Sequence, residues 1–201
     1  MNKKGPSFLQ FESPWYFDPG TIRLPSPPDG LSAEEAAQCL RAGQLTQPYI
    51  LETESERRLH FSQCNVQSVM SLDEPHALVS AYTRKMMGFM LFKPAPKSIV
   101  MVGLGGGSLA KFCYRYLPKT QITVVEIDER VIELRDEFCV PADDHRFRIV
   151  CDDGARTSRI FRRTSTSSWL MRSTRSAWPP HWRPPISMCR RLDDCRRTAC
   201  S

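Results

Sequence analysis

The sequence lacks a long apolar run. No stretch approaches the roughly 20 residues that a membrane-spanning helix needs. Lysines stand near the start, at Lys3 and Lys4, but no apolar segment follows them, so the sequence predicts no secretory signal peptide. Because the eight cysteines show no repeated spacing either, we expect free thiols in a cytoplasmic protein that has no membrane partner.

The sequence also lacks cysteines and histidines at the spacing typical of metal-binding motifs. Zinc sites are built from closely paired cysteines and histidines at short, regular intervals. The cysteines near the end of the chain and the histidine that precedes them do not follow such intervals: Cys189, Cys195, Cys200 and His181. We therefore expect no metal site.

Acidic residues are almost absent from the last part of the chain. Residues 156–201 contain eleven arginines, no lysine, no glycine and two acids, which gives a net charge of +9, whereas residues 1–155 have a net charge of −3. A basic tail favours nucleic-acid binding, which is a remote alternative function here. The preceding residues show no basic excess, so we expect no nucleic-acid partner.

What is present divides the chain into four parts. Residues 1–47 form a proline-rich lead-in with one short helix, which Ser32 and Glu35 begin as a capping box and Gly43 ends. Residues 48–92 read as a small β-rich and helical N-terminal domain: three strand-like stretches, then a helix from Asp73 to about Met90. Residues 97–155 form a third unit, and residues 156–201 an irregular basic tail.

Residues 97–155 alternate between strand and helix patterns. The strands are expected at Ser98–Val102, Ile122–Ile127 and Phe147–Cys151. A helix follows the first strand with an apolar face at Leu109, Phe112, Cys113, Tyr116 and Leu117, and Asp128 caps a second helix that continues to Phe138. This order predicts an α/β fold, a Rossmann-like doubly wound sheet truncated after about three strands.

A glycine-rich turn joins the first strand to the first helix and contains Gly103, Gly105, Gly106 and Gly107. Such a turn lets a ligand approach the N–H groups of the helix N-terminus, although a tight turn can also be purely structural.

Two carboxylates follow the later strands. Glu126 ends the second strand, where a carboxylate can accept from both ribose hydroxyls; the alternative is a solvated residue or a helix cap. Asp153 follows the third strand and can accept from an adenine amino group or serve the turn before Gly154.

These residues resemble the spermidine synthase (polyamine aminopropyltransferase) family, in its short bacterial spermidine-synthase-like branch. The resemblance covers about Tyr49 to Ala155 and is carried by Gln67, Asp73-Glu74, Val102–Ala110, Val125–Asp128 and Asp153–Ala155. It implies a small β-rich domain joined to a Rossmann-like domain of the class I methyltransferase type. It further implies a transferase that uses decarboxylated S-adenosylmethionine as co-substrate and an amine such as putrescine, with a homodimer in the intact form.

By the same resemblance, the 103–107 loop cradles the methionine-derived part of the ligand, Glu126 holds the ribose and Asp153 contacts adenine. Gln67 matches a glutamine near the nucleosulfonium. A surface glutamine is the alternative for that position.

The chain departs from the family in two places. A Tyr-His-Glu run that helps to bind the polyamine is replaced by Ala81–Met86, which leaves the acceptor amine open. A catalytic aspartate in a D-x-x-D segment is also missing, because Ser168–Thr174 contains no carboxylate. The sequence therefore predicts no catalytic residue in this chain and no activity as written.

An S-adenosylmethionine-dependent methyltransferase on the same fold is the nearest alternative. Methyltransferases of this architecture usually carry an acid two positions before the first glycine of the loop. Met101 stands there instead, which disfavours methyl transfer without excluding it.

The codons that can encode the tail permit a second interpretation of residues 156–201. Read one base earlier, Ser168–Thr174 permits L-V-D-A-F-D, residues 179–189 permit L-A-A-A-D-F-Y-V, and residues 190–201 permit A-A-R-R-L-P-P-D-G-V-L. Family members carry D-x-x-D, an acid followed by Phe-Tyr, and an L-x-P-x-G turn in this order. We hypothesise a frameshift near codon 156; the alternative is a genuine disordered basic tail.

Overall fold

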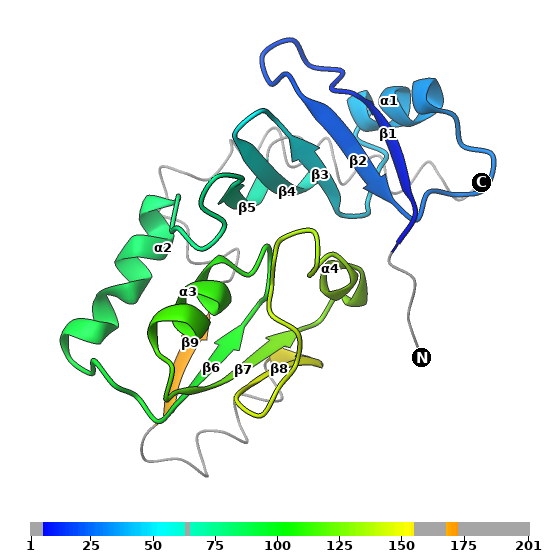
Figure 1. Ribbon diagram of the computed structural model, residues 1–201. Coiled ribbons are helices and arrows are strands. Elements are labelled where there is room, and N and C mark those ends of the chain that lie inside the picture. The colour runs from blue at the N-terminus through cyan, green and yellow to red at the C-terminus, as the bar shows by residue number, and fades with distance from the viewer. Residues whose placement is uncertain (1–5, 63–64, 155–167, 173–201) are drawn as a thin grey trace, which may run out of the picture.

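Two sheets make up the part of the chain that the computed structural model describes, residues 6–62, 65–154 and 168–172 (Figure 1). The first sheet is antiparallel and its strands lie in chain order: β1 (Phe8–Glu12), β2 (Thr21–Pro25), β3 (Tyr49–Glu52), β4 (Glu56–Ser62) and β5 (Asn65–Ser71). Among the described residues, no helix is both long and apolar enough to cross a bilayer.

Helix α1 (Ala33–Arg41) joins β2 to β3 and packs beside β1 (Figure 1). Its start confirms the predicted capping box, because the Ser32 hydroxyl accepts from the Glu35 N–H and the Glu35 carboxylate accepts from the Ser32 N–H. Gly43 follows the last turn with a φ of +68°, a conformation that favours glycine.

The first 25 residues differ from the expected lead-in. They supply β1 and β2, which pair with each other and, through β2, with β3. Proline-rich flanks hide these strands in the sequence, because proline occurs where strands begin or end as readily as in loops. The sheet therefore has no boundary at residue 47, and the division of the chain into domains stays a proposal.

Both faces of the antiparallel sheet are buried. Alternation along β3 sends Tyr49 and Leu51 to the face that α1 covers, where they pack with Trp15 and Leu24. The opposite face joins the core of the second sheet through a set of side chains from β3, β4 and β5: Ile50, Leu59 and Met70. The two sheets thus share one continuous apolar core.

The helix expected from Asp73 begins later. Residues 72–80 form turns, in which the Ser71 hydroxyl accepts from the Glu74 N–H. Helix α2 (Ala81–Met86) starts after the Ser80 cap, and a 3₁₀ turn, η1 (Met87–Leu91), continues it. The Asp-Glu-Pro pattern suits a turn as well as a first helical turn, which explains the error.

The second sheet is parallel, with the order β8-β7-β6-β9. Strand β6 (Ser98–Val102) leads to α3 (Ser108–Tyr116), β7 (Gln121–Glu126) to α4 (Glu129–Glu133), and β8 (Phe147–Cys151) follows. This topology confirms the predicted Rossmann-like fold. From β6 the strand order runs to one side through β7 and β8 and then to the other side at β9, so it reverses between β6 and β9. Ligands of such folds bind at that point, beyond the carboxyl ends of the strands.

Strand β9 (Ser168–Arg172) corrects the prediction of an irregular tail. It lies parallel to β6, so the described sheet has four strands rather than three. The arginine- and serine-rich sequence around it gives no strand signal, and the open edge of β6 supplies hydrogen-bonding groups for a partner. The other tail residues, including His181 and the last three cysteines, lie outside the described residues.

Helix α4 is shorter than predicted. It begins at the Asp128 cap as expected but ends at Glu133, and residues 134–139 continue as turns. Leu134 and Phe138 are nevertheless buried. The periodic apolar pattern therefore predicts which side chains enter the core but not the backbone geometry that carries them there.

Candidate functional site

The glycine-rich loop lies between β6 and α3, at the carboxyl end of the central strand. Its backbone takes positive φ angles at Gly103 (+92°), Gly105 (+53°) and Gly107 (+67°). A residue with a Cβ atom is strained at such φ angles, so the backbone conformation by itself requires glycine at three of the four positions. Gly107 is the N-cap of α3, and no acceptor for the N–H groups of Gly105 and Gly106 occurs among the described residues.

The loop is packed closely from outside. A Cβ on Gly106 would lie 2.9 Å from both the Ser68 Cβ and the Phe138 Cδ1. A Cβ on Gly107 would lie 2.4 Å from the Val140 Cγ2. The glycines are therefore also needed for space, between β5 on one side and the segment after α4 on the other.

Glu126 links the loop to the end of β7. One carboxylate oxygen accepts from the Leu104 N–H at 2.7 Å, and the other accepts from the N–H groups of Ile127 at 2.8 Å and Asp128 at 3.1 Å. The residue is only 9% exposed. The structure thus brings the predicted carboxylate against the predicted loop, and shows a structural role that the sequence did not reveal.

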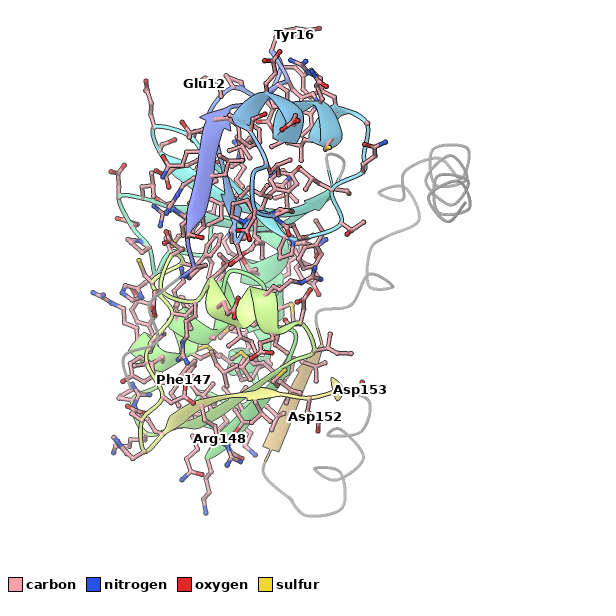
Figure 2. All side chains as sticks on the ribbon, turned by 90° about the vertical axis from the view of Figure 1, so that its right-hand side faces the viewer. Glu12, Tyr16, Phe147, Arg148, Asp152 and Asp153 are labelled. Carbon is pink, nitrogen blue, oxygen red and sulfur yellow. The ribbon has the colours of Figure 1, made fainter. Side chains whose placement is uncertain are left out.

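Asp153 lies at the same edge of the sheet. Figure 2 shows Asp152 and Asp153 at the carboxyl-terminal tip of β8, opposite the end that carries Phe147 and Arg148. The Asp152 N–H donates to the Glu126 carbonyl at 3.0 Å, and the Gly154 backbone packs against Val102. Asp153 therefore lies between neighbours that contact the ends of β7 and β6.

Gln67 meets the loop through its backbone. Its carbonyl oxygen would lie 3.9 Å from a Cβ on Gly105. The side chain that reaches the loop is the next one, Ser68, whose hydroxyl lies 3.2 Å from the Ser108 hydroxyl. The register between β4 and β5 shifts at this point, because Leu59 pairs with Ser68 and His60 with Val66. Gln67 therefore lies in a β-bulge, where the regular alternation of side chains is interrupted.

Sequence reasoning missed three residues of this site. Ser68 and Phe138 flank the loop only because the two sheets pack together, and no local pattern signals that contact. Ile127 follows Glu126 and is 70% exposed, which gives the edge a projecting apolar side chain. The sequence offers one signal for this exposure: Ile127 directly follows the end of the strand, and side chains at that point are no longer covered by the sheet.

Lys111 is a buried cation beneath the loop. The predicted apolar face of α3 is wrong in part: Tyr116 is exposed, and Lys111 is buried beside Ala110 and Cys113. The Lys111 ammonium donates to the Phe138 carbonyl at 2.7 Å. Burial lowers the pKa of Lys111 to about 8.

This burial predicts a pH dependence of stability. The unfolded state holds the lysine proton more tightly than the folded state between about pH 8 and pH 10.5, so folding becomes more favourable as pH rises through that window. Relative to Lys111→Met, the wild type should gain at most about 1.4 kcal/mol per pH unit in denaturant unfolding. The exposed Lys119→Met variant should keep the wild-type slope. A Lys111→Met slope equal to that of the wild type would contradict the prediction.

Two surface hollows lie away from this edge. One, of about 610 Å³, is lined by residues around α1, and the other, of about 620 Å³, by residues of the β1–β2 and β3–β4 turns. Within the described residues, no group of three or more His, Cys, Asp or Glu could hold a metal ion. The candidate site is thus an open strand-end edge with convergent backbone N–H groups and carboxylates.

Comparison with known proteins finds similarity over part of the chain. No protein-family model matches the chain. The polyamine aminopropyltransferase of Neisseria meningitidis serogroup A is 44% identical over 115 residues, which are 56% of this chain and 44% of that protein. The chain thus spans less than half the length of this relative, and the resemblance expected from the loop motifs is confirmed over that segment.

The other similarities include a methyltransferase and a solved structure. Over 58 residues, 29% of this chain and 9% of the relative, the chain is 43% identical to a Drosophila melanogaster protein named eEF1A lysine and N-terminal methyltransferase homolog. A probable spermidine synthase from Corynebacterium glutamicum is 19% identical, with a TM-score of 0.49, covering 67% of this chain and 52% of that structure.

Proposed function

We propose that this chain, which is related to the polyamine aminopropyltransferases over its matched segment, binds a nucleoside of the S-adenosylmethionine type. The observation that carries the proposal is the Glu126 carboxylate, held at the carboxyl end of β7 by three backbone N–H groups, one of them from the glycine-rich loop. Loop and carboxylate are thereby one unit, at the place where folds of this class bind nucleotides.

Each part of this edge suits one part of such a ligand. A carboxylate accepts about four hydrogen bonds, so Glu126 has one position left for a ribose hydroxyl and must exchange a backbone donor to accept both. The glycine-rich loop is proposed to cradle the methionine-derived part, because glycines let a ligand approach the backbone closely. Asp153 is proposed to accept from the adenine amino group, and Gln67 to lie near the sulfonium. No metal is proposed.

Ile127 is proposed to cover one face of the base. Its 70% exposure means that it adds little to the core, so Ile127→Ser should leave the melting temperature within about 1–2 °C of the wild type. Losing one apolar contact should weaken methylthioadenosine binding by about tenfold in calorimetry. Leu91→Ser, at a residue 86% exposed on η1, is the matched control and should bind normally. If the two variants bind methylthioadenosine with equal affinity, Ile127 does not contact the ligand.

Aminopropyl transfer requires more than the nucleoside site. A neutral amine attacks the methylene carbon beside the sulfonium; the new C–N bond forms as the C–S bond breaks, methylthioadenosine leaves, and a base takes the amine proton. Strand β9 ends in register with Val102, directly beside the start of the loop. No carboxylate occurs from Ser168 to Thr174. We infer that the chain as written lacks its catalytic base and is an inactive member of a transferase family.

The frameshift hypothesis is part of this proposal. In the alternative frame, the two aspartates of L-V-D-A-F-D fall at positions 171 and 174, within β9 and just beyond its end. Sequencing the source DNA across codons 150–201 tests it. One added or missing base would make the repaired protein the functional one, and an intact frame would leave this chain a nucleoside-binding remnant.

Calorimetric titration with methylthioadenosine tests the binding proposal. Saturable one-to-one binding to the full chain supports it. If the chain fails to bind but the frame-restored protein binds, the tail is what disables the site. Absence of binding by both proteins would overturn the proposal. With the restored protein, an amine such as putrescine should be converted, and the oligomeric state, proposed as a homodimer, can be measured by ultracentrifugation.

A methyltransferase is the second candidate function, favoured by the 58-residue similarity to a protein of that name. Against it, Met101 is buried in β6 two positions before Gly103, and the position carries no acid. Decarboxylated S-adenosylmethionine should bind the restored protein more tightly than the carboxylated form if the first proposal holds. The reverse order would favour methyl transfer. Nucleic acid is not a proposed partner. Salt-sensitive binding of nucleic acid that is lost on deletion of residues 156–201 would contradict that expectation.

A further inference from the structure

The segment 134–140, between α4 and β8, forms one wall of the glycine-rich loop. Phe138 and Val140 are buried and lie against Gly106 and Gly107. The Lys111 ammonium also holds the Phe138 carbonyl from below. The position of this segment therefore sets the space that the loop occupies.

Glu137, in the middle of this segment, is tied to the antiparallel sheet. Its carboxylate lies 2.7 Å from a guanidinium nitrogen of Arg23 on β2 and 3.5 Å from one of Arg57 on β4. The Arg57 guanidinium also donates to the Glu137 backbone carbonyl. Two elements of the sheet thus hold both the side chain and the main chain of one residue.

Glu52 of β3 completes a cluster of four charged side chains with Arg23, Arg57 and Glu137. Its carboxylate accepts from the Arg57 Nε at 2.6 Å and lies 3.4 Å from an Arg23 guanidinium nitrogen. The four side chains are 15–30% exposed, so solvent screens their attraction less than that of a surface pair. Arginine suits this role because its planar group contacts two carboxylates and a carbonyl at once.

We propose that Arg23, Arg57 and Glu137 are positioning residues, through which the antiparallel sheet holds the segment 134–140 against the loop and fixes the nucleoside site. The cluster contacts no loop atom itself. It acts through Phe138 and Val140, the next residues along the segment. The expected effect of the cluster on ligand affinity rests on the proposed nucleoside function. Its expected effect on the stability of the loop is independent of that function.

Amide hydrogen exchange of the full chain tests the effect on the loop without any ligand. Glu137→Gln keeps the side-chain size but removes the charge that both guanidiniums share. We expect amide exchange to rise about tenfold in peptides covering 103–107 and 134–140, because local opening there becomes more favourable. Arg58→Gln is the matched control: Arg58 also lies on β4 and binds two carboxylates, Asp18 and Glu56, but reaches no part of the segment.

The pattern of exchange decides between positioning and general destabilisation. A rise confined to the two segments in Glu137→Gln and absent in Arg58→Gln supports the proposal. An equal rise across β3 and β4 in both variants, or no rise at all in the loop, overturns it. The double variant Arg57→Gln/Glu137→Gln should exchange faster than Glu137→Gln, since it also removes the bond to the Glu137 carbonyl, but by less than the product of the two single effects, because the two changes share the Arg57–Glu137 ion pair.

Methylthioadenosine titration then measures the consequence for binding. Glu137→Gln should weaken affinity by about fivefold to tenfold at a temperature where all variants are folded, whereas Arg58→Gln should bind like the wild type. Equal affinity of Glu137→Gln and wild type would overturn the link to the site. If the wild type itself does not bind, the proposed function fails, and the exchange data alone decide the positioning role.

Discussion

Gly107→Ala is expected to weaken nucleoside binding severely. The new Cβ would lie 2.4 Å from the Val140 Cγ2, and the backbone φ of +67° is strained for alanine. The left-handed conformation costs roughly 1–2 kcal/mol and overpacking typically another 1–3 kcal/mol, so the loop should be destabilised by about 2–5 kcal/mol. Methylthioadenosine affinity should fall at least about 30-fold in calorimetry.

The steric part of this effect can be separated from the conformational part. Val140→Ala in the Gly107→Ala background removes the clashing methyl and should recover part of the affinity, though not the part lost to backbone strain. Gly88→Ala is the control, because a Cβ there has no neighbour within 4 Å. Wild-type binding by Gly107→Ala would show that the loop does not take part in recognition.

Glu126→Gln should lower both stability and affinity. An amide has one oxygen where the carboxylate has two, so if its oxygen keeps the Ile127 and Asp128 N–H groups, its NH₂ faces the buried Leu104 N–H. An unsatisfied buried donor and a weakened charge-assisted network together cost about 2–4 kcal/mol. For a chain of this size we expect the melting temperature to fall by roughly 5–15 °C.

The matched control for Glu126→Gln is Glu129→Gln, which removes an exposed charge three residues away in the first turn of α4. Its unfolding free energy should change by less than about 0.5 kcal/mol. Glu126→Gln is measured in the same denaturant titrations, followed by methylthioadenosine binding below the melting temperature. A variant as stable as Glu129→Gln would mean that the loop does not depend on the carboxylate.

Both effects have one physical origin. The glycine loop has few contacts of its own, and neighbours on every side hold it: Glu126 from β7, Ser68 from β5, and Phe138 and Val140 from the segment after α4. A change in any of these neighbours should therefore alter the position of the same backbone N–H groups, those of the glycine-rich loop.

Local sequence patterns were sufficient for the elements that form the site. Alternating strand and helix patterns from Ser98 to Cys151, interrupted by glycines, predicted the parallel sheet and placed the loop and Glu126 at its carboxyl edge. Those patterns are local because hydrogen bonds along a strand and the conformational freedom of glycine depend on neighbouring residues. The helix caps at Ser32 and Asp128 were predicted for the same reason.

Weak or very short patterns were not sufficient. Strands β1 and β2 were taken for a lead-in because prolines flank them, and β9 for part of an irregular tail because its partner β6 is distant in sequence. Residue roles that depend on packing were missed too: Lys111 was assigned no burial, and Ser68 no contact with Gly106.

The sequence by itself therefore determined which segment resembles the polyamine aminopropyltransferases, the order of the parallel strands before the tail, and where the glycine-rich loop and Glu126 of the candidate site lie in the fold. Only the tertiary structure decided that the two sheets share a core, that β9 completes one edge of β6, and that Arg23, Arg57 and Glu137 connect the antiparallel sheet to the loop wall. Local conformation follows from near neighbours in the chain, whereas contacts between segments distant in the sequence arise only when buried faces pack together.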